Sequence, residues 1–354
     1  MNQPNKLSHD ILIVGSGLAG SSLAYRLMQS GKRVLLIADP DTPSASRVAA
    51  GLINPVTGQR LVLQNNIEAL LATALSFYHQ LEELFDQKLL HSREMLRVIR
   101  NEKEAKAWKK RKEDPAYKPY LGDFKESNSD INAPAGLFSQ HHTGFLDTNR
   151  LLDSLHRHFL EQQAMQAAKV HYNDISVTPD GVQWQDIHAK QMIFCEGWRG
   201  SNNPWFNHLP FQPAKGEIVT FYTDFRLPEH IINAGNWIIP IDQHTFKLGA
   251  TYDWNVLDES VTDDAKEKLM QAMNQIFVDP PKSRLIEQSA GVRPGSRDKE
   301  PFIGFHHEHP QLGIFNGFGS KGSLLTPWYS EVFARHITHG DALPASANIT
   351  RFNG

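Results

Sequence analysis

The sequence predicts an α/β protein built from two interleaved domains, and three observations support this fold class. An apolar segment, a glycine-rich turn, a helix-like segment and a second apolar segment follow one another over residues 11–39. Strand and glycine-turn signals return near residues 192–197 and 314–337, so the elements of one domain are spread along the chain. Strand-rich sequence lies between these segments of the first domain. A chain of 354 residues has room for about two domains.

Composition excludes several classes of protein. The net charge of -3 predicts no strong attraction to nucleic acid or to an anionic membrane. The only cysteine, Cys195, excludes an internal disulfide and a cysteine-based zinc site, and it fits a reducing compartment. The N-terminus is polar, and the apolar run 11–14 is too short for a signal peptide or a membrane span. We therefore expect a soluble cytoplasmic protein.

The first elements form a strand, a turn, a helix and a second strand. "ILIV" predicts a buried strand, "GSGLAG" the turn, and "LAGSSLAYRLMQSG" a helix that ends at a glycine. "RVLLIADPD" predicts the second strand, which ends in Asp39. In this context the glycine pattern is the fingerprint of a Rossmann-like dinucleotide-binding unit, with phosphates held by backbone N–H groups at the helix start. The predicted contacts are Gly15, Gly17, Leu18, Ala19 and Gly20, with Asp39 on a ribose hydroxyl.

The remaining elements follow in order. Helices are predicted over 66–88, over the charged segment 100–114, over 145–166 with Asp147 or Thr148 as its cap, and over 261–278. Strands are predicted around 175–195, 216–223, 236–241 and 245–252, and a strand, glycine turn and helix over 314–337. We expect a nucleotide-binding domain of residues 8–80, 140–210 and 290–354. A second domain with an antiparallel sheet would hold residues 81–139 and 211–289.

Ordered motifs along nearly the whole chain resemble the D-amino-acid-oxidase-like family of FAD-dependent amine oxidoreductases, which includes glycine oxidase and sarcosine oxidase. The motifs are "DILIVGSGLAGSSLAYRL", "SASRVAAGLINP", "KGEIVTFY" with "FKLGATY", and "AGVRPGSRDKEPFIG" with "GFGSKGSLLTP". The resemblance implies a FAD-binding domain interleaved with a substrate domain. It also implies non-covalent FAD, because Gly291 stands where members with covalent flavin have a cysteine.

The resemblance implies further FAD contacts from two segments. "SASRVAAGL" is similar to the segment that lies along the flavin, and "GFGSKG" is similar to the last glycine turn, whose N–H groups face the pyrimidine edge. The implied contacts are Ser46, Arg47, Ala49, Ala50, Gly51, Leu52, Gly319, Lys321, Gly322 and Ser323.

The resemblance also implies residues that act on the substrate. Arg293 matches the arginine that binds a substrate carboxylate, an interaction that suits two planar groups. Trp237 stands where glycine oxidase has a tyrosine, Tyr252 matches a pocket position, and Leu52 lies on the substrate side of the flavin. Because Trp237 offers no O–H, the substrate is not fixed as a simple amino acid.

The function implied is oxidation of the C–N bond of an amino acid or secondary amine by hydride transfer to flavin N5, giving an imine that hydrolyses. Oxygen is one candidate acceptor. The first alternative is an oxidase that acts on a carboxymethylaminomethyl-type modified tRNA uridine, which the net charge disfavours. The second is an NAD-dependent dehydrogenase or a non-catalytic nucleotide-binding protein. We predict no metal site, since "HHEH" at 306–309 reads as a surface turn.

Overall fold

The computed structural model describes residues 8–352, which divide into two compact units. Unit 1 holds residues up to Ala49, Thr148–Ala214 and the chain from Val292 onward, and unit 2 holds Ala50–Asp147 and Lys215–Gly291. The α/β fold class is confirmed. The division differs from the predicted one at residues 50–80 and 140–147, which belong to unit 2. The physical reason is strand pairing, because β10 (Gly144–Leu146) pairs with β3 (Leu52–Ile53) on one side and with β6 (Leu90–Ser92) of unit 2 on the other. The assignment of nucleotide and substrate roles to the two domains stays a prediction.

Unit 1 is built on one eight-stranded sheet. Its order is β11-β2-β1-β14-β13-β12, and β21 joins β14 to β20. The strands are β1 (His9–Val14), β2 (Val34–Ala38), β11 (Met165–Ala167), β12 (Ile175–Thr178), β13 (Gly181–Trp184), β14 (Ile187–Phe194), β20 (Phe302–Phe305) and β21 (Leu312–Asn316). The pairs β1–β2, β1–β14, β2–β11 and β14–β21 are parallel. Continuous apolar sequence such as "VLLIA" in β2 is fully buried, as expected for parallel strands covered on both faces.

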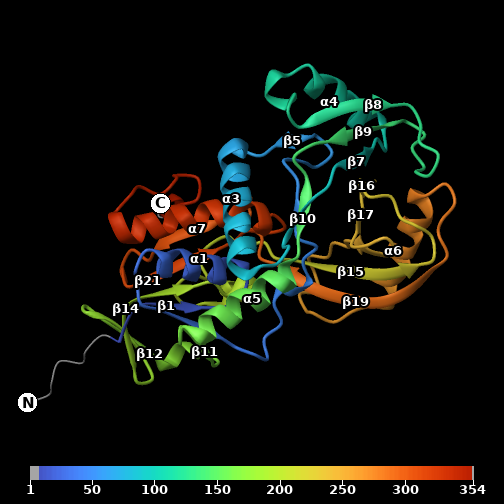
Figure 1. Ribbon diagram of the computed structural model, residues 1–354. Helices are drawn as coiled ribbons and strands as arrows, with labels where there is room; N and C mark the ends of the chain where they lie inside the picture. The colour runs from blue at the N-terminus through green and yellow to red at the C-terminus, as the bar shows by residue number, and fades with distance from the viewer. Residues whose placement is uncertain (1–7, 353–354) are drawn as a thin grey trace, which may run out of the picture. The chain divides into compact units, whose positions relative to one another are not determined.

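Helices cover this sheet (Figure 1). They are α1 (Leu18–Gln29), α2 (Ala45–Val48), α5 (Thr148–Glu161) and α7 (Gly322–His339), with 3-10 turns at Tyr172–Asp174, Gly197–Asn202 and Ile349–Phe352. The helix α1 contacts both α7 and α5. Its buried residues Leu23 and Leu27 are spaced four apart, which places them on one face. Burial of such a leucine contributes about 1.5–3 kcal/mol.

Unit 2 is dominated by a second eight-stranded sheet of order β19-β15-β18-β17-β16-β7-β9-β8. Its strands are β7 (Met95–Val98), β8 (Leu121–Lys125), β9 (Leu137–Gln140), β15 (Ala214–Thr223), β16 (Ile231–Asn233), β17 (Trp237–Pro240), β18 (Thr245–Gly249) and β19 (Ser283–Arg293). The described pairings are antiparallel except β16–β7. Short strands β4 (Val56–Thr57) and β5 (Val62–Leu63) form a hairpin, and β6 (Leu90–Ser92) pairs with β10.

Three helices complete unit 2 and match the predicted segments within a few residues. They are α3 (Ile67–Phe85), α4 (Glu102–Lys112) and α6 (Asp263–Ile276). The apolar face of α6, with Leu269 and Met273, packs with Phe246 and Leu248 of β18 in one buried cluster. Thr262 caps α6, accepting a hydrogen bond from the Ala265 amide. In residues 8–352, no helix combines the length and the apolar character needed to cross a membrane.

Candidate functional site

The glycine turn after β1 is shaped by close backbone packing. Gly15 has φ +103°, and a Cβ on it would lie 2.4 Å from the Cys195 carbonyl oxygen. A Cβ on Gly20 would lie 1.8 Å from the Gly15 carbonyl oxygen. Only glycine fits either position, because both obstacles are backbone atoms that cannot swing away. The turn therefore has the tight geometry that the sequence pattern predicts.

The start of α1 is open for an anion. Its N-cap is Gly17, which offers no side-chain cap, so amides of the first turn lack partners within the helix. The Leu18 amide donates to Ser46 Oγ at 3.0 Å. A Cβ on Gly17 would lie 3.1 Å from Ser46 Oγ and 3.3 Å from Ser44 Oγ. Backbone amides and two hydroxyls thus meet at one helix N-terminus, a donor set that fits the pyrophosphate of a dinucleotide such as FAD. Ser44 is an addition to the predicted residues.

The last glycine turn joins the same region of unit 1. The Gly319 amide donates to the Pro294 carbonyl oxygen at 3.0 Å, directly beside Arg293. The N-cap of α7 is Lys321, again without a side-chain cap. A Cβ on Gly322 would lie 3.6 Å from Leu18 Cδ1. Within unit 1 the structure therefore brings together the first glycine turn, Ser46, the last glycine turn and the Arg293 segment.

Lys321 is partly buried near an acid. Burial lowers the pKa of its ammonium, and the neighbouring Glu300 carboxyl opposes that shift. Burial also raises the pKa of Glu300, which accepts a hydrogen bond from the Tyr329 hydroxyl at 3.3 Å. Ser323, the second residue of α7, is buried. The N-terminus of α7 thus carries both the helix dipole and a partly desolvated cation.

The side chain of Arg47 points to α5. Its Nη1 lies 2.5 Å from Asp153 Oδ1 and donates to the Asn149 carbonyl oxygen at 3.1 Å. Ala49, two residues on, accepts a hydrogen bond from the Thr148 hydroxyl at 3.3 Å. The guanidinium therefore anchors α2, while contact between Arg47 and FAD stays a prediction.

Asp39 ends β2 as predicted, and its carboxylate is occupied by its own turn. It accepts from Thr42 Oγ1 at 2.6 Å and from the Asp41 amide at 3.0 Å. The Thr42 hydrogen bond is the main cause of the lowered pKa of Asp39. The carboxylate is therefore ionised at neutral pH and still able to accept from a ribose hydroxyl, which stays a prediction.

Three of the predicted residues of unit 2 converge on one apolar cluster. Ala50, Leu52 and Trp237 pack against the buried side chains of Met95, Phe145, Ile231 and Ile239. The Trp237 ring also lies under Gly249, where a Cβ would be 2.5 Å from Cζ2. The ring is therefore held by packing on both sides.

The other two predicted residues of unit 2 differ in character. Gly51 has φ +69°, and a Cβ there would lie 1.9 Å from the Leu146 carbonyl oxygen, so β10 already requires a glycine. Tyr252 is 53% exposed and packs on Trp254, with ring centroids 5.0 Å apart. Tyr252 thus belongs to an exposed aromatic pair and not to the Trp237 cluster.

A partly buried carboxyl beside the glycine turn was not predicted. Glu196 follows β14 and Cys195, and it accepts from the Tyr172 hydroxyl at 2.8 Å and from Asn203 Nδ2 at 2.9 Å. Burial raises the pKa of Glu196 and that of the Cys195 thiol. The motif "FCEG" indicates the end of a strand, but it does not indicate that Tyr172 and Asn203 donate hydrogen bonds to Glu196.

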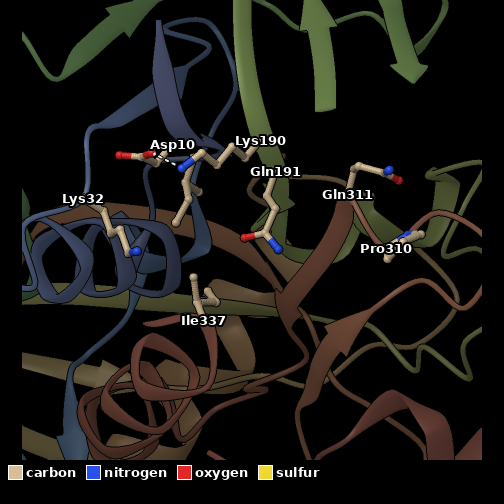
Figure 2. Close-up of a pocket in the computed structure, with 8 residues that line it drawn as sticks. Asp10, Lys32, Lys190, Gln191, Pro310, Gln311 and Ile337 are labelled. Atoms are coloured by element: carbon tan, nitrogen blue, oxygen red, sulfur yellow. Dashed lines mark ion pairs between the residues drawn. The ribbon is translucent and has the colours of Figure 1, made fainter. Parts of the chain in front are cut away.

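A hollow of about 310 Å³ lies elsewhere in unit 1 (Figure 2). It is lined by Asp10, Ile11, Lys32, Lys190, Gln191, Pro310, Gln311 and Ile337. An ion pair of 3.0 Å joins Asp10 to Lys190 across it. Asp10 lies at the amino end of β1, whereas the glycine turn follows its carboxyl end. The hollow is therefore separate from the predicted site residues.

The histidine-rich turn offers a weak ligand set. Ligand atoms of His306, Glu308 and His309 lie within 4.8 Å of one another. However, His306 Nδ1 accepts from the amides of Glu308 and His309 at 3.2 Å. The lone pair of Nδ1 is thus occupied by these hydrogen bonds. The neutral ring then carries its proton on Nε2, so that nitrogen offers no lone pair to a metal. The absence of a metal stays a prediction.

The converging glycine turns, the two helix starts without side-chain caps and the parallel sheet are typical of dinucleotide-binding proteins. The DAO family model, described as FAD dependent oxidoreductase, matches residues 10–336. The chain therefore belongs to this family of FAD-dependent oxidoreductases, and FAD is its cofactor. Family membership excludes the NAD-dependent and non-catalytic alternatives.

Curated relatives include the tRNA 5-methylaminomethyl-2-thiouridine biosynthesis bifunctional proteins MnmC. That of Acinetobacter baylyi is 23% identical over 98% of this chain and 55% of its own length, and that of Dichelobacter nodosus is 26% identical over 94% and 55%. This chain thus spans about half the length of these relatives. Glycine oxidase of Pseudomonas putida is 27% identical over 47% of this chain and 45% of its own length.

Solved structures share the fold. Glycine oxidase from Bacillus cereus aligns with a TM-score of 0.78 at 18% identity, covering 95% of this chain and 96% of its own. Iminodiacetate oxidase from Chelativorans sp. BNC1 aligns with a TM-score of 0.77 at 20% identity, covering 96% and 99%.

Proposed function

We propose that this protein oxidises the C–N bond of a small amino acid or secondary amine. The observation that carries the proposal is the meeting in unit 1 of the first glycine turn, Ser46, the last glycine turn and the Arg293 segment. The names of the relatives support the substrate class, since glycine oxidase and iminodiacetate oxidase are both named for small amino acids.

Arg293 is proposed to bind the substrate carboxylate through two parallel N–H···O hydrogen bonds. This pairing fixes the position of the carbon that loses hydride, which is the main contribution a protein makes in flavin chemistry. Bound FAD would supply the acceptor for that hydride at its N5. The amine must be uncharged when the hydride leaves, and apolar surroundings favour the uncharged form. The carbon loses hydride and the nitrogen a proton, and the resulting imine is hydrolysed by water.

FAD is proposed to be held without a covalent bond. The one cysteine, Cys195, is buried beside Gly15, and burial raises the pKa of its thiol, which lowers the fraction of reactive thiolate. Gly291 stands where covalent members carry their cysteine. Oxygen is the proposed electron acceptor, and the single cysteine supports the cytoplasm as the proposed location.

The test is anaerobic bleaching of the flavin absorbance in the purified protein. The panel contains glycine, sarcosine, iminodiacetate, D-amino acids and L-proline. We expect at least one of them to reduce the flavin and to yield a carbonyl product. Bleaching by dithionite but by no amine of the panel would overturn the small-substrate proposal. Reoxidation in air then tests oxygen as the acceptor.

A second candidate is oxidation of a modified tRNA uridine, favoured by the MnmC relatives that cover 94–98% of this chain. In unit 2, α4 presents the exposed Lys103, Lys109 and Lys110. Lysines of this kind contact phosphates, and each such contact contributes about 0.9 to the slope of log affinity against log salt. The variant Lys109→Gln/Lys110→Gln should lower that slope by about 2 in tRNA binding.

The matched control is Lys266→Gln/Lys268→Gln on α6, whose ammonium groups pair with Asp263 and Asp264. It should leave tRNA binding unchanged. Salt-independent binding, or equal loss in both variants, would count against this second candidate.

A further inference from the structure

A polar chain connects the first glycine turn to α2 through a histidine of α5. His156 Nε2 lies 2.9 Å from the Ser16 carbonyl oxygen, and Nδ1 lies 3.5 Å from Arg47 Nη2. The Ser21 hydroxyl also donates to the Ser16 oxygen, at 2.9 Å. His156 therefore contacts two of the segments that meet at the start of α1.

The partners determine where the proton of the imidazole lies. A carbonyl oxygen only accepts, so His156 Nε2 must carry the hydrogen. A guanidinium only donates, so Nδ1 must lack one. The ring is thus neutral, in the Nε2–H form. Protonation would place an N–H of Nδ1 against the cationic Arg47 and would break that contact.

The Ser16 carbonyl matters because of its position in the turn. It shares a planar trans peptide with the Gly17 amide, so its C=O and that N–H point in opposite directions. When His156 and Ser21 hold the Ser16 oxygen, they turn the Gly17 N–H away from α5. On the other route, Arg47 follows Ser46, whose hydroxyl accepts from the Leu18 amide at 3.0 Å. His156 is therefore connected to the Gly17 amide through Ser16, and to the Leu18 amide through Arg47 and Ser46.

We propose that uncharged His156 is a positioning residue that orients the Gly17 amide and the Ser46 segment for the pyrophosphate of FAD. The proposal rests on the FAD dependence of the family. It predicts that FAD binds tightly only while His156 is neutral, so that acid weakens the cofactor complex.

The charges around His156 agree with a neutral ring. Burial is the largest effect and lowers the pKa of His156, and Arg47 of α2 lowers it further. The Ser16 carbonyl and Asp153 of α5 act in the opposite direction. The Ser16 carbonyl of the loop and the Ser21 hydroxyl of α1 contact Nε2, and both groups are uncharged. At neutral pH the ring is uncharged, and it gains a proton only as the pH falls below the usual histidine range.

The test is the FAD dissociation constant of the apoprotein, followed by FAD fluorescence between about pH 5 and pH 8. In the wild type we expect Kd to rise on acidification, by at most about tenfold per pH unit, because one proton must be released on binding.

The variant His156→Gln keeps a donor for Ser16 and an acceptor for Arg47 but does not titrate. Its Kd should stay near the neutral wild-type value throughout. The variant His156→Leu should bind FAD about tenfold more weakly at every pH, since the Ser16 carbonyl and the Arg47 guanidinium each lose one hydrogen-bond partner.

The matched control is His158→Gln on the same helix, whose ring packs on Tyr25 and Phe159. It should retain the wild-type pH profile. A wild-type Kd that does not change with pH, or a His156→Gln protein with the wild-type profile, would overturn the proposal. If no variant and no wild type binds FAD at neutral pH, the FAD dependence itself fails. The wild-type titration needs no substitution, so a variant that does not fold leaves the proposal testable.

Discussion

The predicted FAD contacts in the glycine turns of unit 1 would act mainly through the backbone, whereas Leu52 and Trp237 of unit 2 would act through side chains. In unit 1 the glycine turns allow close approach of main-chain atoms, and two helix starts lack a side-chain cap. In unit 2 Trp237 and Leu52 offer shape and apolar surface on a packed cluster. Main-chain amides bind phosphate groups, which all dinucleotide cofactors share. Side chains differ in shape and polarity, so they distinguish one substrate from another. Substitutions in the two units should therefore separate cofactor affinity from substrate kinetics.

The largest effect is expected for Gly20→Ala. Alanine normally stabilises a helix relative to glycine by about 0.5–1 kcal/mol. Here its Cβ would lie 1.8 Å from the Gly15 carbonyl oxygen, so the turn or α1 must move. We expect a cost of about 3 kcal/mol, the upper end of overpacking effects, and FAD binding weaker by about 100-fold. Absorbance of the purified protein and the FAD Kd measure it.

Gly31→Ala is the control, because a Cβ there meets nothing within 4 Å. Its φ of +76° costs about 1–2 kcal/mol in stability, but FAD affinity should not change. If Gly20→Ala binds FAD like the wild type, the backbone account of unit 1 is wrong.

The next effect is expected for Arg293→Ala. Loss of a charge-assisted hydrogen-bonded pair costs about 1.5–3 kcal/mol, so kcat/KM for a carboxylate substrate should fall by about 10- to 150-fold. The FAD Kd should change by less than about twofold, since Arg293 is proposed to act on the substrate. Arg293→Lys should recover part of the loss, because it keeps the charge but not the fork geometry. Arg297→Ala, at an exposed position four residues on, is the control. Equal weakening of FAD and substrate binding would make Arg293 structural.

A smaller effect is expected for Gly249→Ala in unit 2. The new Cβ would lie 2.5 Å from Cζ2 and 2.7 Å from Cη2 of Trp237, so the indole ring must shift. We expect a change in KM of about fivefold, equivalent to about 1 kcal/mol of overpacking, with the FAD Kd unchanged. The double variant Trp237→Phe/Gly249→Ala should recover most of the KM, because the smaller ring leaves room. Independent effects of the two changes would mean that Gly249 does not act through Trp237.

The same contrast explains what could be predicted from sequence. The turn at Gly15–Gly20 could be predicted because only glycine tolerates the close approaches found there, and the pattern records that requirement. His156 could not, since a histidine on an amphipathic helix gives no sign of the Ser16 oxygen, 140 residues away in the chain. The place of residues 50–80 in unit 2 could not be predicted either, because β3 is linked to β6 through β10, which lies far along the chain. Local sequence patterns determine where helices and strands form. Residues far along the chain determine which of these elements lie side by side.

The smallest effect is expected for Glu196→Gln. This variant tests whether the Glu196 carboxyl, beside the glycine turn, keeps its proton in the folded protein. Burial raises the pKa of Glu196 even though Tyr172 and Asn203 donate to it. Between the ordinary glutamate pKa and this raised value, the unfolded chain is ionised while the folded carboxyl keeps its proton. Stability therefore falls as the pH rises through that window. Glutamine has no proton to lose, so the stability of the variant should rise relative to that of the wild type as the pH increases. Urea unfolding at about pH 5 and pH 8 measures the difference, with the surface variant Glu308→Gln as the control. A difference between Glu196→Gln and wild type that is the same at both pH values would show that Glu196 is ionised in the folded protein.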